Sequence, residues 1–306
     1  MRRRSGCNVK SPGASCLQRY NGRPMPELPE VEVAARNLRR WMARRRIRAL
    51  TADARARRLF RPSTPAALQA LAGARFQRLR RIGKNLLLTF AGKSGPLGVW
   101  SHLGMTGKWL RRAAGQPAPS ASRVALELDH GIYLHYVDPR MFGRFRLVAH
   151  ARFEQLPEIA RLGPDPLNDG IDAAALRARL AGLRTPIKVA LLDQTLLAGV
   201  GNIQANESLF RAAIDPRRPA RTLTGAEVKR LAAAILESIH FTLDAFAAAG
   251  ADGGGADIGY VEERQTENPF LVYGREGASC PRCKKGKIVR IVQAQRATFF
   301  CPRCQK

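Results

Sequence analysis

Long apolar runs are missing from this sequence. No stretch approaches the roughly 18 consecutive apolar residues that would span a bilayer, and the longest apolar segments contain Lys, Arg, His or Gly. The first residues are basic but lack the apolar core of a secretory signal. We therefore expect no membrane partner and a reducing compartment. A chain of 306 residues can form two or three compact domains.

Acidic residues are also scarce, since 24 Asp and Glu stand against 52 Lys and Arg, for a formal net charge of +28. Such a charge repels itself in a compact fold unless a polyanion screens it. DNA, RNA and an anionic membrane are candidates, and coding bias with a solvated surface would give the same count. Arginine greatly outnumbers lysine and suits bidentate phosphate and base contacts. We therefore predict a nucleic-acid partner.

Cysteines number only six, but four of them form two C-P-R-C pairs near the C-terminus. The pairs are separated by 17 residues, a spacing typical of tetrahedral zinc sites rather than of unliganded core thiols. Four thiolates leave no position for water or substrate. We therefore predict one structural Zn²⁺ ion per chain, held by Cys280, Cys283, Cys301 and Cys304.

The apolar pattern predicts a multi-domain α+β protein. Residues 1–25 have no acids and no apolar periodicity, which predicts disorder. A helix is expected from about Pro29, and period-two alternation between about 74 and 148 predicts a β-rich domain, sandwich or barrel. Asp129-His-Gly131 is typical of a hairpin turn. Helical spacing follows, in segments 173–183, 186–197, 203–212 and 228–239.

The C-terminal part is predicted to hold a loop and a zinc hairpin. Five glycines within 250–269 prevent regular structure, so we expect either a lid over an extruded base or a disordered connector. Strands are expected at 287–292 and 297–300, with Arg296 at or near the hairpin tip. The predicted divisions are therefore 1–25, 26–150, 151–249, 250–269 and 270–306.

Three glycine-bounded motifs could contact DNA, although each also has an ordinary structural interpretation. Gly199-Val-Gly-Asn202 either leaves backbone N–H groups free for a phosphate or simply connects two helices. The other two, 102–107 and 138–143, carry Met105, Arg140 and Phe142. These side chains could fill the stack vacated by an extruded base, or they could belong to the core.

Together these motifs resemble those of the formamidopyrimidine-DNA glycosylases, which are bifunctional base-excision repair enzymes. The resemblance runs from Pro26 to Lys306 and rests on six ordered motifs: Pro26-Glu-Leu-Pro-Glu-Val-Glu32, the strand with Lys84, His102-Leu-Gly-Met105, Asp138-Pro-Arg140 with Phe142-Gly143, Gly199-Val-Gly-Asn202-Ile203 and Gln295-Arg-Ala-Thr-Phe299. It implies an N-terminal β-sandwich, a helix-two-turn-helix domain and a zinc β-hairpin finger. Damaged double-stranded DNA would lie in the cleft between domains.

The resemblance also implies a set of site residues. Pro26 would be the nucleophile, Glu27 would carry protons beside it, and Lys84 and Arg296 would complete the catalytic set. The residues implied to contact DNA or the lesion are Glu30, His102, Met105, Arg140, Phe142, Lys188, Asn202, Glu207 and Tyr273. Among these, Met105, Arg140 and Phe142 would replace the flipped nucleotide, with Arg140 facing the orphaned cytosine. The implied substrates are 8-oxoguanine and formamidopyrimidines.

The implied chemistry needs a free secondary amine, whereas Pro26 is internal in this sequence. We expect translation from Met25 followed by loss of methionine. A cleaved targeting segment and a retained inhibitory extension are the alternatives, and residues 1–25 leave organelle targeting open. Otherwise the expected protein is a cytoplasmic, nucleoid-associated monomer.

Two positions depart from the family pattern, and three other functions are compatible with parts of the sequence. Gln204 stands where the family often has Tyr, and Met141 where a basic residue is frequent. An endonuclease VIII type enzyme for oxidised pyrimidines is the related alternative, although Met105 and the run from Leu28 to Val31 favour the purine enzyme. A non-enzymatic lesion binder and an RNA-binding zinc protein are the alternatives from other classes.

Overall fold

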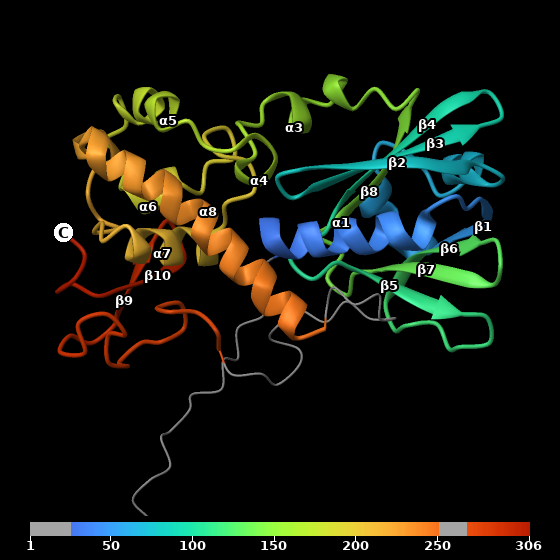
Figure 1. Cartoon of the computed structure of the whole chain (residues 1–306). Coiled ribbons are helices and arrows are strands. Elements are labelled where there is room, and N and C mark those ends of the chain that lie inside the picture. The colour runs from blue at the N-terminus through green and yellow to red at the C-terminus, as the bar shows by residue number, and fades with distance from the viewer. Residues whose placement is uncertain (1–25, 251–267) are drawn as a thin grey trace, which may run out of the picture.

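The computed structural model describes residues 26–250 and 268–306. The predicted extension 1–25 and nearly all of the predicted loop 250–269 lie outside the described residues. Within them, an N-terminal β-sandwich is followed by a helical domain and a C-terminal hairpin module (Figure 1).

The first helix, α1 (Leu28–Met42), begins where the sequence predicts it. Pro29 occupies its first turn, and the Glu30 carboxylate accepts a hydrogen bond from the Glu27 backbone N–H at 2.9 Å. Most of the helix is buried, because it lies against the sandwich and also contacts the helical domain (Figure 1). The N-terminus of α1 therefore reaches the boundary between the two domains.

The sandwich consists of two antiparallel four-stranded sheets, in the orders β1-β6-β7-β5 and β2-β3-β4-β8. Its strands are β1 (Ile47–Ala52), β2 (Arg75–Ile82), β3 (Asn85–Gly92), β4 (Gly95–His102), β5 (Lys108–Ala113), β6 (Ser122–Leu128), β7 (Ile132–Val137) and β8 (Arg144–Ala149). The expected hairpin turn joins β6 to β7, with His130 and Gly131 at positive φ. Strand β1 was not predicted, because it precedes the alternating range of about 74–148 and Arg48 interrupts its own short apolar pattern. A short helix, α2 (Arg57–Phe60), packs on β8.

The helical domain contains α3 (Pro157–Ala160), α4 (Pro166–Asp169), α5 (Ala173–Leu180), α6 (Ile187–Ala190), α7 (Asn202–Arg211) and α8 (Gly225–Ala248). The predicted helix over 186–197 is wrong beyond its first turn. Helix α6 ends at Ala190, and the Asp193 carboxylate then accepts a hydrogen bond from the Thr195 N–H, which forms a local turn in place of a helix.

Helix α8 is long and apolar enough to cross a membrane, and half of its most apolar window is buried inside the protein. Its apolar residues, including Val228, Leu231, Ile235 and Ile239, belong to the same buried cluster as α1 and the sandwich interior. Helix α8 is therefore a core helix of this fold.

The C-terminal module contains the strands β9 (Val289–Gln293) and β10 (Arg296–Phe300). They pair antiparallel around a two-residue turn, in which Ala294 and Gln295 both have positive φ, as a primed turn requires. The turn is thus shorter than the predicted 293–296. The module packs on α7 through β10.

Candidate active site and nucleic-acid interface

The centre of the site is the Glu27 carboxylate, which lies at the N-terminus of α7. Its two oxygens accept hydrogen bonds from the backbone N–H groups of Ile203 at 2.7 Å and of Gln204 at 3.0 Å. A Cβ atom on Gly201 would lie only 2.3 Å from the Glu27 carboxyl carbon, so this close approach requires glycine. The positive end of the helix dipole is thus occupied by a protein carboxylate, in place of the phosphate that the sequence suggested.

The two glutamates of the α1 N-terminus are buried in spite of their charge. Burial raises the pKa of Glu27, while nearby Lys84 and the hydrogen bonds from α7 oppose the shift. Burial and the neighbouring Glu27 raise the pKa of Glu30 to about 7. Two carboxyl groups beside Pro26 therefore have raised pKa values, which suits them to hold and transfer protons.

Two lysines supply positive charge to this centre. Burial lowers the pKa of Lys84, on the turn between β2 and β3, although Glu27 and Glu30 act in the opposite direction. Lys188 is fully buried, and burial together with Arg296 lowers its pKa to about 8. Its ammonium has no hydrogen-bond partner among the described residues. An unpaired buried cation of this kind is suited to bind an anionic group of a ligand.

His102 is a neutral donor in this site. Its Nδ1 accepts a hydrogen bond from the Gly104 N–H at 2.9 Å. Burial, together with the charges of Lys84 and Arg144, lowers the pKa of His102 to about 4. At neutral pH the ring proton therefore resides on Nε2, which can donate a hydrogen bond to a ligand.

Met105 and Phe142 lie on two loops that contact each other. A Cβ on Gly104 would lie 2.5 Å from the Phe142 carbonyl carbon, and Gly104 has a φ of +62°, so glycine is required there. The Asp138 carboxylate joins the loops, because it accepts hydrogen bonds from the Thr106 hydroxyl and the Gly143 N–H. Phe142 is one of two large hydrophobic residues exposed in the described part of the chain.

The exposed side chain of Arg140 stacks on Phe142, with its guanidinium carbon 4.9 Å from the ring centroid. Phe142 and Arg140 thus project together from the sandwich, and Met105 lies half-buried beside them. Among these residues, the interpretation of Phe142 as a core residue is wrong, because a core side chain would be buried.

The finger brings a third group of residues to the start of α7. The Asn202 amide donates hydrogen bonds to the Ala297 carbonyl at 3.1 Å and to the Tyr273 hydroxyl at 3.4 Å. Arg296 begins β10 and is exposed, and its charge affects the pKa values of Glu27, Lys84 and Lys188. Residues from all three parts of the chain therefore converge on one centre.

The structure corrects the expectation that Glu207 contacts DNA. It is buried, and its carboxylate accepts hydrogen bonds from the backbone N–H groups of Leu271, Val272 and Tyr273 and from Arg211. A buried, saturated carboxylate has no capacity left for DNA, and its charge would repel phosphate. Glu207 instead anchors the C-terminal module to α7.

Two further residues near the centre were not predicted from the sequence. Arg81 is fully buried, and Asp165 contacts both its guanidinium and the turn that carries Lys84. No local pattern indicates this pair, because the two residues are 84 positions apart.

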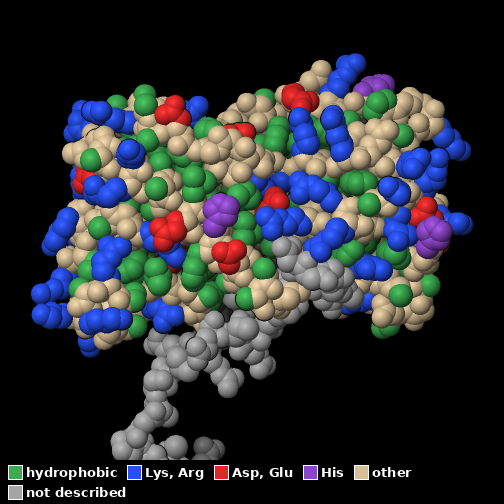
Figure 2. Space-filling view, viewed as in Figure 1, with side chains coloured by type: hydrophobic (Ala, Val, Ile, Leu, Met, Phe, Trp, Pro, Cys, Tyr) green, Lys and Arg blue, Asp and Glu red, His purple; other side chains and the backbone are tan. Residues whose placement is uncertain are grey.

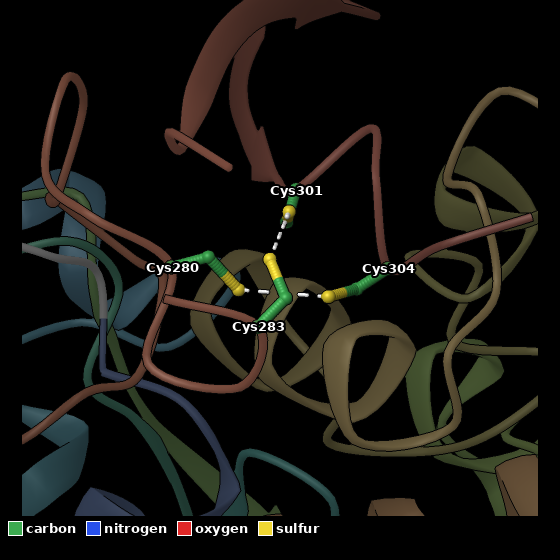
Figure 3. A group of neighbouring side chains, drawn as sticks. All are labelled: Cys280, Cys283, Cys301 and Cys304. Atoms are coloured by element: carbon green, nitrogen blue, oxygen red, sulfur yellow. Dashed lines mark hydrogen bonds between the residues drawn. The ribbon is translucent and has the colours of Figure 1, made fainter. Parts of the chain in front are cut away.

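The four predicted cysteines form one cluster, with all Sγ atoms within 4.8 Å of one another (Figure 3). The Sγ atoms of Cys280 and Cys304 are 3.7 Å apart, and those of Cys283 and Cys301 are 4.0 Å apart. A tetrahedral zinc ion with Zn–S bonds of about 2.3 Å would separate its sulfurs by roughly 3.8 Å. The donor set and its spacing therefore fit a structural metal ion.

The surface is rich in cations. Figure 2 shows Lys and Arg side chains over both domains and few acidic groups on the visible face. With the sandwich, the helical domain, the cysteine module and a buried glutamate centre between them, the chain has the architecture of a DNA-binding repair glycosylase.

Comparisons with known proteins agree with this class. Three family models match the chain: the formamidopyrimidine-DNA glycosylase N-terminal domain at residues 25–145, the H2TH domain of the same enzymes at 162–249, and the zinc finger found in FPG and IleRS at 277–306. A formamidopyrimidine-DNA glycosylase of Cereibacter sphaeroides is 43% identical, and the match covers 92% of this chain and 100% of that protein. One of Rhodospirillum centenum is 42% identical with the same coverage.

Solved structures show the same fold. The MutM (Fpg) protein of Thermus thermophilus has a TM-score of 0.72 and 38% identity, covering 92% of this chain and 98% of that one. A Lactococcus lactis Fpg bound to DNA containing N7-benzyl-Fapy-dG has a TM-score of 0.78 and 29% identity, covering 92% of this chain and 100% of that one. The chain belongs to the formamidopyrimidine-DNA glycosylase family, whose members are DNA glycosylases and AP lyases of base-excision repair.

Proposed function

We propose that this protein excises 8-oxoguanine and formamidopyrimidines from duplex DNA and then cleaves the strand by successive β- and δ-elimination. Family membership supports the reaction class. The Lactococcus lactis relative, solved with N7-benzyl-Fapy-dG DNA and with abasic-site DNA, supports the substrate class. The observation that carries the proposal is the buried Glu27 carboxylate, which α7 holds directly beside Pro26.

The proposed nucleophile is the Pro26 nitrogen. It attacks C1′ of the damaged nucleoside, the glycosidic bond breaks, and the base leaves with a proton. Opening of the sugar gives an iminium ion whose nitrogen carries no proton, so its positive charge is permanent and acidifies C2′. Loss of the C2′ proton expels the 3′ phosphate, a second elimination expels the 5′ phosphate, and water then releases the enzyme.

Glu27 is the proposed proton carrier for these steps. Its raised pKa favours protonation of the sugar oxygen at ring opening, and the resulting carboxylate can then remove a proton. Glu30 stabilises the position of the Glu27 backbone. We assign phosphate and lesion contacts to Lys84, Lys188, His102, Arg296, Asn202 and Tyr273.

Selection of the opposite base is assigned to the two contacting loops. Met105 and Phe142 would fill the space left by the extruded nucleotide, and Arg140 would donate to the orphaned cytosine. Stacking of Arg140 on Phe142 restricts the guanidinium and supports this role. Arg140→Ala should relax discrimination between cytosine and adenine opposite the lesion, and an unchanged ratio of excision rates would remove this assignment.

The cysteine cluster is proposed to hold one structural Zn²⁺ ion. Bound zinc would supply folding energy to a module whose apolar cluster is small and is shared with α7. Cys283→Ser should lose the metal and weaken DNA binding while the β-sandwich remains folded. Elemental analysis that finds no zinc in active protein would contradict this proposal. We further propose that the protein acts as a cytoplasmic monomer on nucleoid DNA.

A second candidate function is the excision of oxidised pyrimidines, because a Lactococcus lactis relative is described in complex with oxidised pyrimidine-containing DNA. Parallel assays on duplexes with 8-oxoguanine and with an oxidised pyrimidine distinguish the two candidates by their relative rates.

Borohydride trapping tests the nucleophile. Reduction of the iminium should join a chain that begins at Pro26 covalently to 8-oxoguanine duplex. The 306-residue chain should give no adduct, because its Pro26 nitrogen is an amide. Equal trapping by the verified full chain would show that another amine, such as that of Lys84, is the nucleophile. No adduct from either chain would leave the non-enzymatic lesion binder as the better hypothesis.

A further inference from the structure

Arg81 is an arginine with no exposed side-chain surface at the end of β2. Its Nε donates to Glu32 on α1 at 2.7 Å. Its Nη1 donates to the Gly83 carbonyl at 3.0 Å, and both Nη atoms donate to the Asp165 carboxylate, at 2.5 and 3.0 Å. One guanidinium therefore joins α1, the turn before Lys84 and the first segment of the helical domain.

Arg81, Gly83, Asp165 and Asn168 form one hydrogen-bonded group, here called the joint, to which Asp165 and Asn168 contribute from the helical domain. The Asp165 carboxylate caps α4 and also accepts a hydrogen bond from the Gly83 N–H at 2.6 Å. The Asn168 amide donates to the Arg81 carbonyl at 2.8 Å, and its oxygen accepts from the guanidinium at 3.2 Å. Both backbone groups of Gly83, directly before Lys84, are thus held by Arg81 and Asp165.

The joint continues into the loop that receives Glu27. The carbonyl of Pro164, next to Asp165, accepts a hydrogen bond from the Ala198 N–H at 3.0 Å. The following residue, Gly199, accepts one from the Leu28 N–H at 3.2 Å. A path of hydrogen bonds and peptide bonds therefore runs from Arg81 through Asp165 and the 198–199 backbone to Leu28 at the start of α1, and Glu32 on α1 closes it at Arg81.

We propose that the Arg81–Asp165 joint is a positioning element for the reaction, which sets Lys84 and the α7 N-terminus against Pro26 and Glu27. Both residues are buried, and their polar side-chain atoms already have protein partners, so neither is free to contact DNA. Arginine is required because its planar donors serve two carboxylates and a carbonyl at once, whereas a lysine ammonium is a point charge. This proposal rests on the proposed function only in its kinetic test, because that test measures excision of the damaged base.

The test uses the active chain, an 8-oxoguanine duplex, and a duplex with an uncleavable tetrahydrofuran abasic site. For Arg81→Lys and Asp165→Asn we expect single-turnover excision to fall by about 100-fold, since misplacement of reacting groups by about 1 Å has that cost. Affinity for the tetrahydrofuran duplex should stay within about threefold, since no phosphate contact is lost. The limb of the pH profile that reports Glu27 should move to higher pH, because a displaced Lys84 no longer lowers that carboxyl's pKa.

Arg218→Lys is the matched control, because Arg218 makes a similar two-bond pair with Glu227 at 2.5 and 3.1 Å within the helical domain. Its excision rate should stay within about twofold of the wild type. If Arg81→Lys does not fold, Asn168→Ala removes only the outer contacts and should slow excision by about fivefold. Unchanged excision in the Arg81 and Asp165 variants, an equal loss in Arg218→Lys, or a loss confined to DNA affinity would overturn the proposal.

Amide hydrogen exchange at Gly83 gives a readout that does not need activity. Exchange should accelerate in Asp165→Asn and stay unchanged in Arg218→Lys, because only the first variant weakens the acceptor of that N–H. If the wild type excises nothing, the proposed function fails, whereas the exchange rate at Gly83 still tests whether Asp165 holds the turn before Lys84. Unchanged exchange at Gly83 in Asp165→Asn would overturn the proposal independently.

Discussion

Helix α7 is associated with two buried glutamates, Glu27 bound at its N-terminus and its own residue Glu207, and their chemical consequences differ. At its N-terminus, Glu27 from the sandwich accepts two backbone hydrogen bonds, but its burial outweighs these bonds and the nearby positive charges, so its pKa is raised. Further along, Glu207 accepts three backbone hydrogen bonds and pairs with Arg211. An incompletely compensated carboxylate can exchange protons, whereas a saturated one is structural.

Glu27→Gln should have the largest effect of the variants that test this difference between Glu27 and Glu207. Single-turnover excision should fall by about 10³-fold, because the proton carrier is lost. The free energy of unfolding should fall by only about 1–3 kcal/mol, because the amide oxygen still accepts one hydrogen bond from α7 while the second N–H loses its acceptor. Quench-flow assays and urea denaturation measure the two quantities. A variant that keeps more than about a tenth of the rate would exclude Glu27 as the carrier.

Glu207→Gln should have the opposite profile. Removing one member of a buried, hydrogen-bonded pair should cost about 4 kcal/mol of unfolding free energy and loosen residues 268–306. Urea denaturation and limited proteolysis of that module would detect the loss. The control is Glu237→Gln, whose side chain is 68% exposed and only 3.4 Å from Arg211, and which should cost less than about 0.5 kcal/mol. Equal effects of both variants would contradict the anchoring role.

Glu30 extends the comparison to the pH dependence of the unfolding free energy. Its pKa is about 7 in the folded protein and 4.5 ordinarily, so its protonated form is favoured by folding. The stabilisation is complete below pH 4.5 and is lost as pH rises through 7, by about 3 kcal/mol in total. Glu30→Gln should remove this decrease in unfolding free energy, whereas exposed Glu276→Gln should not. Glu27, whose pKa is also raised, contributes a decrease of its own, so a decrease of undiminished size in Glu30→Gln would contradict the assignment.

The smallest expected effect concerns Lys188, whose pKa is lowered to about 8. A phosphate beside its ammonium would raise that pKa, so binding should take up a proton above pH 8. Duplex affinity should then fall by up to about tenfold per pH unit above that value. Lys188→Arg should flatten the dependence, because guanidinium stays charged. Fluorescence anisotropy measures duplex affinity across this pH range. Identical pH dependence of affinity in the wild type and in Lys188→Arg would argue against a phosphate contact.

Local sequence patterns determined much of this protein. The Cys pairs predicted the thiol cluster, the Gly199-Val-Gly-Asn202 segment suggested backbone N–H groups available to an anion, and period-two alternation identified most strands, because each depends on spacing within a short segment. Only the tertiary structure decided which charged residues are buried and which groups they contact. Glu207 was expected at DNA and proved buried, and no local pattern distinguishes Arg81 from the many other arginines. Charge compensation depends on partners far away in sequence, such as Asp165 for Arg81 and the 271–273 backbone for Glu207, and only folding brings them together.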